Sequence, residues 1–285
     1  MTLRVGTRGS RLALAQAALA TRSLGDVRLV VIRTRGDDSA EPLAQLGEGI
    51  FVRALEDALR RGEVDLVVHS LKDLPTEESR GLVIAAIPQR EDARDVLISA
   101  DRSGLAGLAQ GATVGTSSVR RTGFLRVLRP DVRTVAIRGN VDTRLAKVER
   151  GEYGGAMLAL AGLRRLGIAV SEAEILPLDL CLPAPGQGAL ALQCRADHPA
   201  TIALLAQLDD PATRVAVEAE RALLRLLGAS CEIPLGAYGR VEGDEVVLDA
   251  ALATDTGVRR TRAVARTAAE AARRAAGELG TLAHA

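Results

Sequence analysis

Short apolar runs recur along much of the chain, and the segments between them have the length and polarity of helices. The run at residues 64–69 is rich in Val and Leu, which is typical of a strand that is buried on both faces of a sheet. The predicted strands cover residues 4–7, 29–34, 64–69, 82–87, 96–99, 113–115, 134–137 and 156–159. Because strands and helices alternate, the pattern predicts an α/β fold with mainly parallel sheets.

Two stretches interrupt this alternation and indicate where the chain passes between two lobes. Residues 88–95 are mostly polar, and residues 182–188 contain two prolines and two glycines, which exclude regular structure. A strand at 189–193 would return the chain to the first lobe. A ligand would then lie in the cleft between the lobes, as in two-lobed binding proteins.

The pattern changes again from about residue 211. A helix ends at Gly228, two segments of alternating apolar residues follow at 246–253 and 258–265, and an alanine-rich helix closes the chain. This order predicts a small α+β domain with an antiparallel sheet. We therefore expect a first lobe of residues 1–88 and 189–207, a second lobe of residues 94–182, and a C-terminal domain of residues 211–285.

A cluster of reactive side chains follows the predicted strand at 64–69. The chain continues directly into Ser70, Lys72 and Asp73, and Pro75 prevents a helix or strand from continuing. Ligands of open α/β sheets bind at the carboxyl ends of the strands. Asp73 is therefore the first candidate for chemistry.

Arginines and hydroxyl residues follow two other predicted strands. Arg8 and Ser10 follow the first strand, and Ser10 is the expected N-cap of the next helix. In the second lobe, residues 116–118 (Thr116, Ser117 and Ser118) precede Arg120 and Arg121 in a first helical turn. Arginine is unfavourable at a helix N-terminus, so a bound carboxylate or phosphate would compensate for these charges.

Two further turns in the same lobe repeat this design. Arg138 and Arg144 follow the strand at 134–137, and Arg165 follows the strand at 156–159. An exposed ion pair contributes about 0 to 1 kcal/mol, whereas a hydrogen bond to a charged group in a partly dehydrated site contributes roughly 1.5 to 3 kcal/mol. Each turn alone is compatible with a solvated arginine, but three at successive strand ends predict a ligand with several carboxylates.

Composition narrows the function classes. The 37 basic and 36 acidic residues nearly cancel, and the chain has no Trp, two Phe and two Tyr, which argues against a nucleic-acid binder. The amino terminus has no leader pattern and no apolar run reaches membrane-spanning length, so we expect a cytoplasmic protein without membrane contact. The three His and the three Cys are dispersed, without a CxxC pair, so we expect neither a metal site nor a disulfide framework.

Six motifs, in this order and over nearly the whole chain, closely resemble those of the porphobilinogen deaminase family, also called hydroxymethylbilane synthases. They are HSLKDLP, GTSSVRR, IRGNVDTRL, LAGLRRLG, LPAPGQGALAL and GASCEIPLGAY. The resemblance implies two periplasmic-binding-protein-like lobes, a small α+β domain and a monomer. It also implies a transferase that joins four porphobilinogen molecules head to tail, releases ammonia, and yields the linear tetrapyrrole hydroxymethylbilane for haem biosynthesis.

The resemblance assigns roles to particular residues. It implies a dipyrromethane cofactor attached through a thioether to Cys231, which by itself would be taken for a small buried residue. It implies that Asp73 stabilises the cations formed as ammonia leaves and as pyrroles join, and that Asp73 shuttles protons. The residues implied to hold the cofactor are Lys72, Asp73, Ser118, Arg120, Arg121 and Arg144. Those implied to hold substrate are Arg8, Ser10, Ser70, Thr116, Ser117, Arg138, Arg165 and Gln187.

One segment departs from the family pattern, and one other function fits part of the sequence. Family members commonly carry a lysine in the glycine-rich stretch that corresponds to residues 42–51, where this chain has none. The alternative function is a non-catalytic, two-lobed module that binds carboxylates. Such a module accounts for the arginines but not for the C-terminal domain or the thiol of Cys231.

Overall fold

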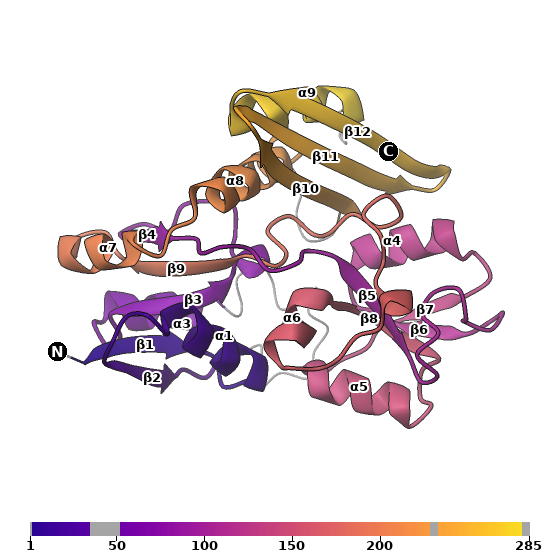
Figure 1. Ribbon diagram of the computed structural model, residues 1–285, viewed down its shortest axis with the longest axis horizontal. Coiled ribbons are helices and arrows are strands. Elements are labelled where there is room, and N and C mark those ends of the chain that lie inside the picture. Colours follow the sequence, from indigo (N-terminus) through magenta and orange to yellow (C-terminus); the bar gives the residue numbers. More distant parts are fainter. Residues whose placement is uncertain (1, 35–51, 229–232, 281–285) are drawn as a thin grey trace. The chain divides into compact units, whose positions relative to one another are not determined.

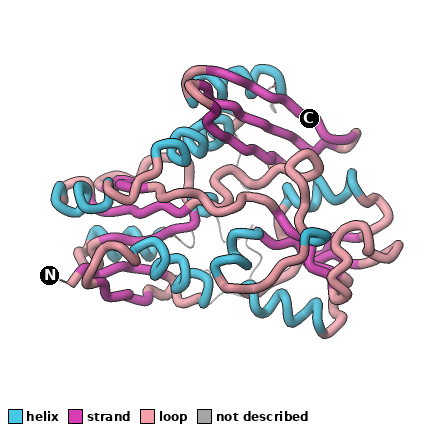
Figure 2. Tube along the Cα trace, viewed as in Figure 1, coloured by secondary structure: helices cyan, strands magenta, loops and turns pink. Residues whose placement is uncertain are grey.

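The computed structural model describes residues 2–34, 52–228 and 233–280. Packing divides the chain into two compact units, one of Met1–Arg90 with Ala189–Arg214 and the other of Glu91–Gly188 with Val215–Ala285. Figure 1 labels the elements of both units, and Figure 2 distinguishes helices from strands. The finer division into three domains stays a prediction.

The first unit is a five-stranded sheet with helices on both faces. Its elements are β1 (Leu3–Thr7), α1 (Arg11–Thr21), β2 (Val27–Val31), α3 (Arg53–Arg60), β3 (Leu66–Ser70), the 3₁₀ turn η2 (Leu71–Asp73), β4 (Leu82–Ala86), β9 (Leu190–Arg195) and α7 (Pro199–Ala206). The strand order is β2-β1-β3-β9-β4. β1 runs parallel to β2 and β3, while β9 runs antiparallel to β3 and β4.

Alternate residues of these strands face two separate apolar clusters. Leu66 and Val68 of β3 pack with α1 and α7, whereas Val67 packs with α3 on the other face. Since side chains alternate along a strand, a run that is apolar at successive positions needs cover on both faces. This explains why β3 has no polar residue until its carboxyl end.

The second unit contains a four-stranded sheet in the order β5-β8-β6-β7. Its elements are β5 (Asp95–Ser99), β6 (Thr113–Gly115), α4 (Val119–Leu128), β7 (Arg133–Val135), α5 (Val141–Glu149), β8 (Gly155–Ala159), α6 (Leu160–Arg165) and the 3₁₀ turn η3 (Glu172–Glu174). β6 is parallel to β7 and β8, and β5 is antiparallel to β8. The carboxyl ends of β6, β7 and β8 therefore lie at one edge, together with the start of β5.

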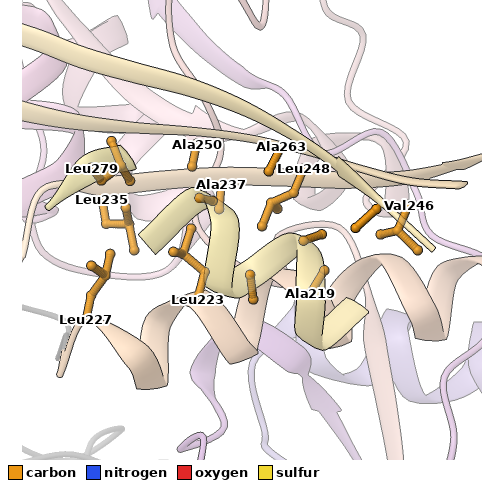
Figure 3. Packing of buried hydrophobic residues seen from close by; sticks show 14 of the residues in the cluster. Ala219, Leu223, Leu227, Leu235, Ala237, Val246, Leu248, Ala250, Ala263 and Leu279 are labelled. Atoms are coloured by element: carbon orange, nitrogen blue, oxygen red, sulfur yellow. The ribbon is translucent and has the colours of Figure 1, made fainter. Parts of the chain in front are cut away.

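The same unit contains a three-stranded antiparallel sheet near the end of the chain. Its elements are α8 (Pro211–Leu226), whose first turn belongs to the first unit, β10 (Leu235–Glu242), β11 (Glu245–Thr254), β12 (Gly257–Ala265) and α9 (Ala268–Leu279). Its core contains Leu223 of α8, Leu235 of β10, Leu248 of β11 and Leu279 of α9. Figure 3 shows these side chains between the helices and the sheet.

The predicted order of an α/β part followed by a small antiparallel sheet is confirmed, but the first sheet is mixed, with two parallel and two antiparallel strand pairs, because β9 enters it between β3 and β4. All eight strands predicted in the first part of the chain are present, with ends displaced by a few residues. The strand β10 was not predicted. It contains Gly236 and Gly239, and glycine is a weak signal for a strand.

Candidate active site

In the first unit, two neighbouring parallel strands carry predicted site residues to the same sheet edge. Arg8 and Ser10 follow β1, and Ser70 ends β3. Ser10 is the N-cap of α1, as predicted, because its hydroxyl accepts a hydrogen bond from the amide of Ala13 at 3.2 Å. The hydroxyl of Ser70 donates to Oε1 of Gln16 at 3.2 Å, which joins the end of β3 to α1.

Asp73 lies in the short turn η2 immediately after β3. Leu71, at the start of this turn, is fully buried, and its amide donates to the carbonyl of Ala189 at 3.0 Å. Lys72 is half-buried and Asp73 is exposed. The turn is thus fixed by an apolar anchor, while its carboxylate faces outward at the edge where a ligand is expected.

In the second unit, three parallel strands deliver hydroxyl residues and arginines to one edge. Ser118 is the N-cap of α4 and accepts from the amide of Arg121 at 3.4 Å. Thr116 is buried, and its hydroxyl accepts from the amide of Ser118 at 3.2 Å. Ser117 donates to the carbonyl of Ile137 at 2.9 Å, which joins the turn after β6 to the segment after β7.

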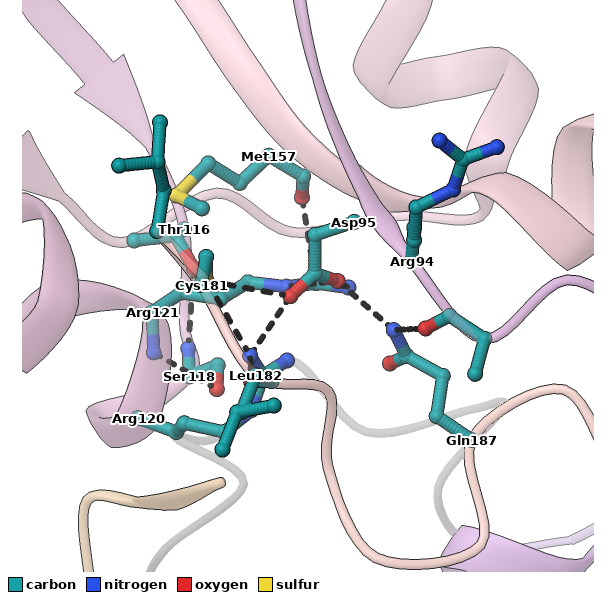
Figure 4. A network of polar contacts seen from close by, with 12 residues as sticks. Arg94, Asp95, Thr116, Ser118, Arg120, Arg121, Met157, Cys181, Leu182 and Gln187 are labelled. Atoms are coloured by element: carbon teal, nitrogen blue, oxygen red, sulfur yellow. Dashed lines mark hydrogen bonds and ion pairs between the residues drawn. The ribbon is translucent and has the colours of Figure 1, made fainter. Parts of the chain in front are cut away.

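Arg120 and Arg121 are buried, and both form ion pairs with a residue that sequence reasoning missed. Nη1 of Arg120 lies 2.6 Å from Oδ2 of Asp95, and Nη2 of Arg121 lies 2.7 Å from Oδ1 (Figure 4). Arginines at a helix N-terminus were expected to need a compensating negative charge. Asp95, a residue of the chain itself, supplies one such charge. In the sequence, Asp95 is the last residue of the polar stretch 88–95, and the only signal of its role is that a buried apolar strand follows it directly.

Two other predicted arginines of this unit lie in the helices that follow β7 and β8. Arg144 is in the first turn of α5, and burial together with the charges of Arg121 and Arg138 lowers its pKa. Burial also lowers the pKa of Arg165 to about 10, although Glu91 partly opposes that shift. Cationic side chains are therefore held where their charge is disfavoured, which is a common feature of functional sites.

Gln187 is the remaining predicted residue of this unit. Its side chain is buried, and its amide nitrogen donates to the carbonyl of Ala93 at 2.7 Å and to Oδ1 of Asp95 at 2.9 Å. It therefore belongs to the buried network around Asp95. Its predicted contact with substrate stays a prediction.

The predicted site residues thus form two groups, one on the sheet edge of each unit. Cys231 and the segment 42–51 lie outside the described residues. Within the described ranges, no cluster of His, Cys, Asp and Glu has the arrangement of a metal site. No helix among them has the length and apolar character needed to cross a membrane.

Fold and site together define a class of α/β protein that presents cationic side chains at the carboxyl ends of parallel strands. Two family models match the chain, "Porphobilinogen deaminase, dipyromethane cofactor binding domain" over residues 3–203 and "Porphobilinogen deaminase, C-terminal domain" over residues 214–283. The chain belongs to the porphobilinogen deaminase family.

Similar proteins carry the same family name. Porphobilinogen deaminase 1 of Streptomyces coelicolor is 51% identical over 252 residues, which cover 85% of this chain and 79% of that protein. The porphobilinogen deaminase of Acidothermus cellulolyticus is 51% identical over 265 residues, covering 90% of this chain and 80% of that protein. The porphobilinogen deaminase of Burkholderia thailandensis is 45% identical over 282 residues, covering 95% and 86%.

Two solved structures show a weaker likeness. A periplasmic binding protein from Brucella ovis aligns with a TM-score of 0.41 and 16% identity, covering 80% of this chain and 70% of that chain. An ancestral cationic amino acid solute binding protein aligns with a TM-score of 0.45 and 14% identity, covering 73% and 87%.

Family membership confirms the predicted reaction. The chain is a transferase of tetrapyrrole biosynthesis that condenses four porphobilinogen molecules with release of ammonia and gives hydroxymethylbilane. Its cofactor is dipyrromethane. The alternative of a non-catalytic carboxylate-binding module is not favoured by these matches.

Proposed function

We propose that the two sheet edges carry out this condensation, with Asp73 as the catalytic carboxylate and the arginines as carboxylate-binding groups. One observation carries the proposal. Two buried guanidinium groups, those of Arg120 and Arg121, share the single negative charge of Asp95. Among the residues that the structure describes, one of these two buried positive charges therefore has no counter-charge, and a bound carboxylate would neutralise it.

The side chains present fit a cofactor that carries carboxylates. In the described part of the chain, the buried Nε atoms of Arg120 and Arg165 have no hydrogen-bond partner. A buried donor without an acceptor costs roughly 1 to 3 kcal/mol, so an acceptor on a bound molecule would stabilise both. When bound, dipyrromethane supplies the pyrrole to which the first substrate is added. The residues proposed to hold it are Lys72, Asp73, Ser118, Arg120, Arg121 and Arg144, with Cys231 as its point of covalent attachment.

Asp73 is proposed to act on the substrate as ammonia leaves. Departure of ammonia places a positive charge on porphobilinogen, and a fixed carboxylate near that charge lowers the barrier. The exposed position of Asp73 in a turn anchored by Leu71 supports this role, since the carboxylate is held in place but accessible. The same carboxylate would accept and return protons at the pyrrole nitrogens.

The substrate carboxylates are proposed to bind to the hydroxyl and cationic residues at both edges. These residues are Arg8, Ser10, Ser70, Thr116, Ser117, Arg138, Arg165 and Gln187. The burial that lowers the pKa of Arg165 supports its inclusion, because a bound anion would restore the favourable environment that burial removes.

One experiment on purified protein tests the assignment of Cys231 and Asp73. Intact-mass measurement is expected to show the sequence mass plus one dipyrromethane for the parent protein and for Asp73→Asn, but the bare sequence mass for Cys231→Ala. Asp73→Asn should release ammonia from porphobilinogen at a rate lower by roughly 100-fold or more. Active parent protein without added mass would refute the attachment, and near-normal turnover of Asp73→Asn would refute the catalytic role.

We further propose that the chain works as a monomer in the cytoplasm, with the three domains described above. The described cysteines, Cys181 and Cys194, are free thiols, as expected in a reducing compartment. Light scattering of the purified protein should give a mass near 29.8 kDa. A mass near twice that value would contradict the monomer.

A further inference from the structure

Asp95 is a completely enclosed acidic group that contacts two arginines of the predicted anion site. It is the first residue of β5, and its side chain has no exposed surface. Besides the two short ion pairs, Nε of Arg121 donates to Oδ1 at 3.1 Å. Figure 4 shows the carboxylate between these guanidinium groups and the amide of Gln187. Both oxygens of Asp95 are therefore engaged by positively charged donors.

The two guanidinium groups are also fixed by main-chain carbonyls. Nη1 of Arg120 donates to the carbonyl of Leu182 at 2.6 Å, and Nη1 of Arg121 donates to the carbonyl of Met157 at 2.9 Å. Asp95 lies between the two arginines and contacts both, so it links two groups that are each held by a different segment. The orientation of each guanidinium plane is thus determined at more than one atom.

Asp95 remains ionised in this environment. Burial alone would raise the pKa of its carboxyl group, but the charges of Arg120 and Arg121 outweigh burial and hold the pKa well below its usual range. Burial raises the pKa of the Cys181 thiol to about 12, and this protonated thiol donates to Oδ2 of Asp95 at 3.6 Å. The carboxylate is therefore a permanent acceptor for every group around it.

We propose that Asp95 is a positioning residue of the transferase, which holds Arg120 and Arg121 in the geometry that binds carboxylates of the cofactor. Asp95 itself does not contact the reacting atoms. This inference rests on the proposed role of the two arginines in carboxylate binding. Asp95 contacts both guanidinium groups and determines the direction in which their N–H groups point.

The substitution Asp95→Asn distinguishes a positioning role from an effect of net charge, because the two predict opposite changes in carboxylate binding. Asp95→Asn removes a negative charge with almost no change of shape, so the field around Arg120 and Arg121 becomes more positive. If net charge alone mattered, carboxylate binding would become tighter. If Asp95 positions the arginines, binding becomes weaker, since the new amide group donates towards guanidinium groups that need an acceptor.

The test compares Asp95→Asn and Asp95→Glu with a matched control. The control is Asp65→Asn, because Asp65 also forms a close ion pair with an arginine, at 2.7 Å to Arg4, but in the other unit and outside the proposed site. Each protein is characterised by intact mass, by KM and kcat for porphobilinogen per cofactor-loaded molecule, and by circular dichroism.

We expect both Asp95 variants to show a smaller fraction of loaded protein and, per loaded molecule, a kcat lowered by roughly 10-fold to 100-fold with KM unchanged, because Arg120 and Arg121 hold the cofactor and not the incoming substrate. Asp95→Glu keeps the charge but moves the carboxylate, so its defect separates position from charge. The control should keep the loading and kcat of the parent protein. An undiminished loaded fraction and kcat in folded Asp95→Asn would overturn the inference, and so would failure of both Asp95 variants to fold, which would assign Asp95 to stability alone.

Loss of the positioning role and loss of the proposed function give different results in the parent protein. If the parent protein carries no dipyrromethane or does not consume porphobilinogen, the proposed function has failed. If the parent protein is loaded and active and the Asp95 variants match it, the proposed function stands and only the positioning role is lost.

Discussion

His69 begins the motif that carries Asp73, yet its imidazole is buried inside the first unit. Its Nε2 lies 3.0 Å from Oε1 of Gln193, whose amide nitrogen donates to Oε1 of Glu56 at 3.0 Å. Burial lowers the pKa of His69 to about 4, although the hydrogen bond with Gln193 and the charge of Glu56 partly oppose that shift. The neutral ring therefore belongs to a buried polar network with Gln193 and Glu56, and it does not act as a proton donor in the candidate site.

This lowered pKa makes stability depend on pH in a definite direction. The unfolded chain binds a proton at His69 below the usual pKa of 6.5, whereas the folded chain does so only near pH 4. The free energy of unfolding should thus fall as the pH drops below 6.5, by about 1.4 kcal/mol per unit, or roughly 2 kcal/mol at pH 5. Urea unfolding at pH 7 and pH 5 measures this loss.

Two histidine variants isolate the contribution of His69 from that of the carboxyl groups. His69→Gln should lose roughly 2 kcal/mol less than the parent protein between pH 7 and pH 5. The exposed His198 serves as control, and His198→Gln should keep the loss of the parent protein. An equal loss in His69→Gln and the parent protein would contradict a buried neutral imidazole.

At the scale of elements, a single buried carboxylate on α8 joins β10 to the segment that precedes β9. Oε1 of Glu220 accepts from the amide of Gly239 at 2.7 Å, and Oε2 accepts from the amide of Gly186 at 2.6 Å. A Cβ atom at position 239 would lie 2.4 Å from the carbonyl oxygen of Ala216. Glycine at this position lets the strand approach the helix closely enough for the carboxylate to reach it.

Glu220→Gln should destabilise this arrangement without changing its shape. One oxygen becomes an amide nitrogen that cannot accept, so one buried backbone N–H loses its partner at a cost of about 1 to 3 kcal/mol. Denaturant unfolding measures the change. The exposed Glu218 lies on the same helix, and Glu218→Gln is expected to change stability by less than about 0.5 kcal/mol. Equal stability of the two variants would show that the contacts of Glu220 contribute nothing.

Local patterns in the sequence predicted much of the fold, including that the candidate site residues follow strands, while the roles of these residues stay predictions. Apolar runs predicted the strands that are buried on both faces, and Ser10 predicted the start of α1. Both signals are readable because each lies within a few adjacent residues. Asp95 and β10 were missed for physical reasons. The partners of Asp95 are 25 and 26 residues further along the chain, and β10 owes its position to close packing that requires glycine.

The whole molecule is almost neutral, with 37 basic and 36 acidic residues, so its overall field does not attract anions. Affinity for carboxylates must come from local concentrations of arginine. The second unit contains such a concentration of arginines. Among its described residues, Asp95 offsets only part of the charge of Arg120 and Arg121. Burial and neighbouring cations lower the pKa of Arg144. An anion bound there would stabilise the folded state in particular, because the unfolded chain disperses these charges.

Citrate, a small anion with three carboxylates, should therefore raise the unfolding temperature more than sodium chloride of equal ionic strength. Linkage gives about 2.7 kcal/mol of stabilisation at 100 times the dissociation constant. Scanning calorimetry of the Cys231→Ala protein, in which no cofactor occupies these arginines, alone and with each of two further substitutions, tests this expectation. Arg144→Gln should lose most of the citrate effect, whereas Arg274→Gln should keep it, because Arg274 is an exposed residue of α9 paired with Glu270 at 2.5 Å. Equal effects of citrate on the two variants would place the anion-binding charge elsewhere in the molecule.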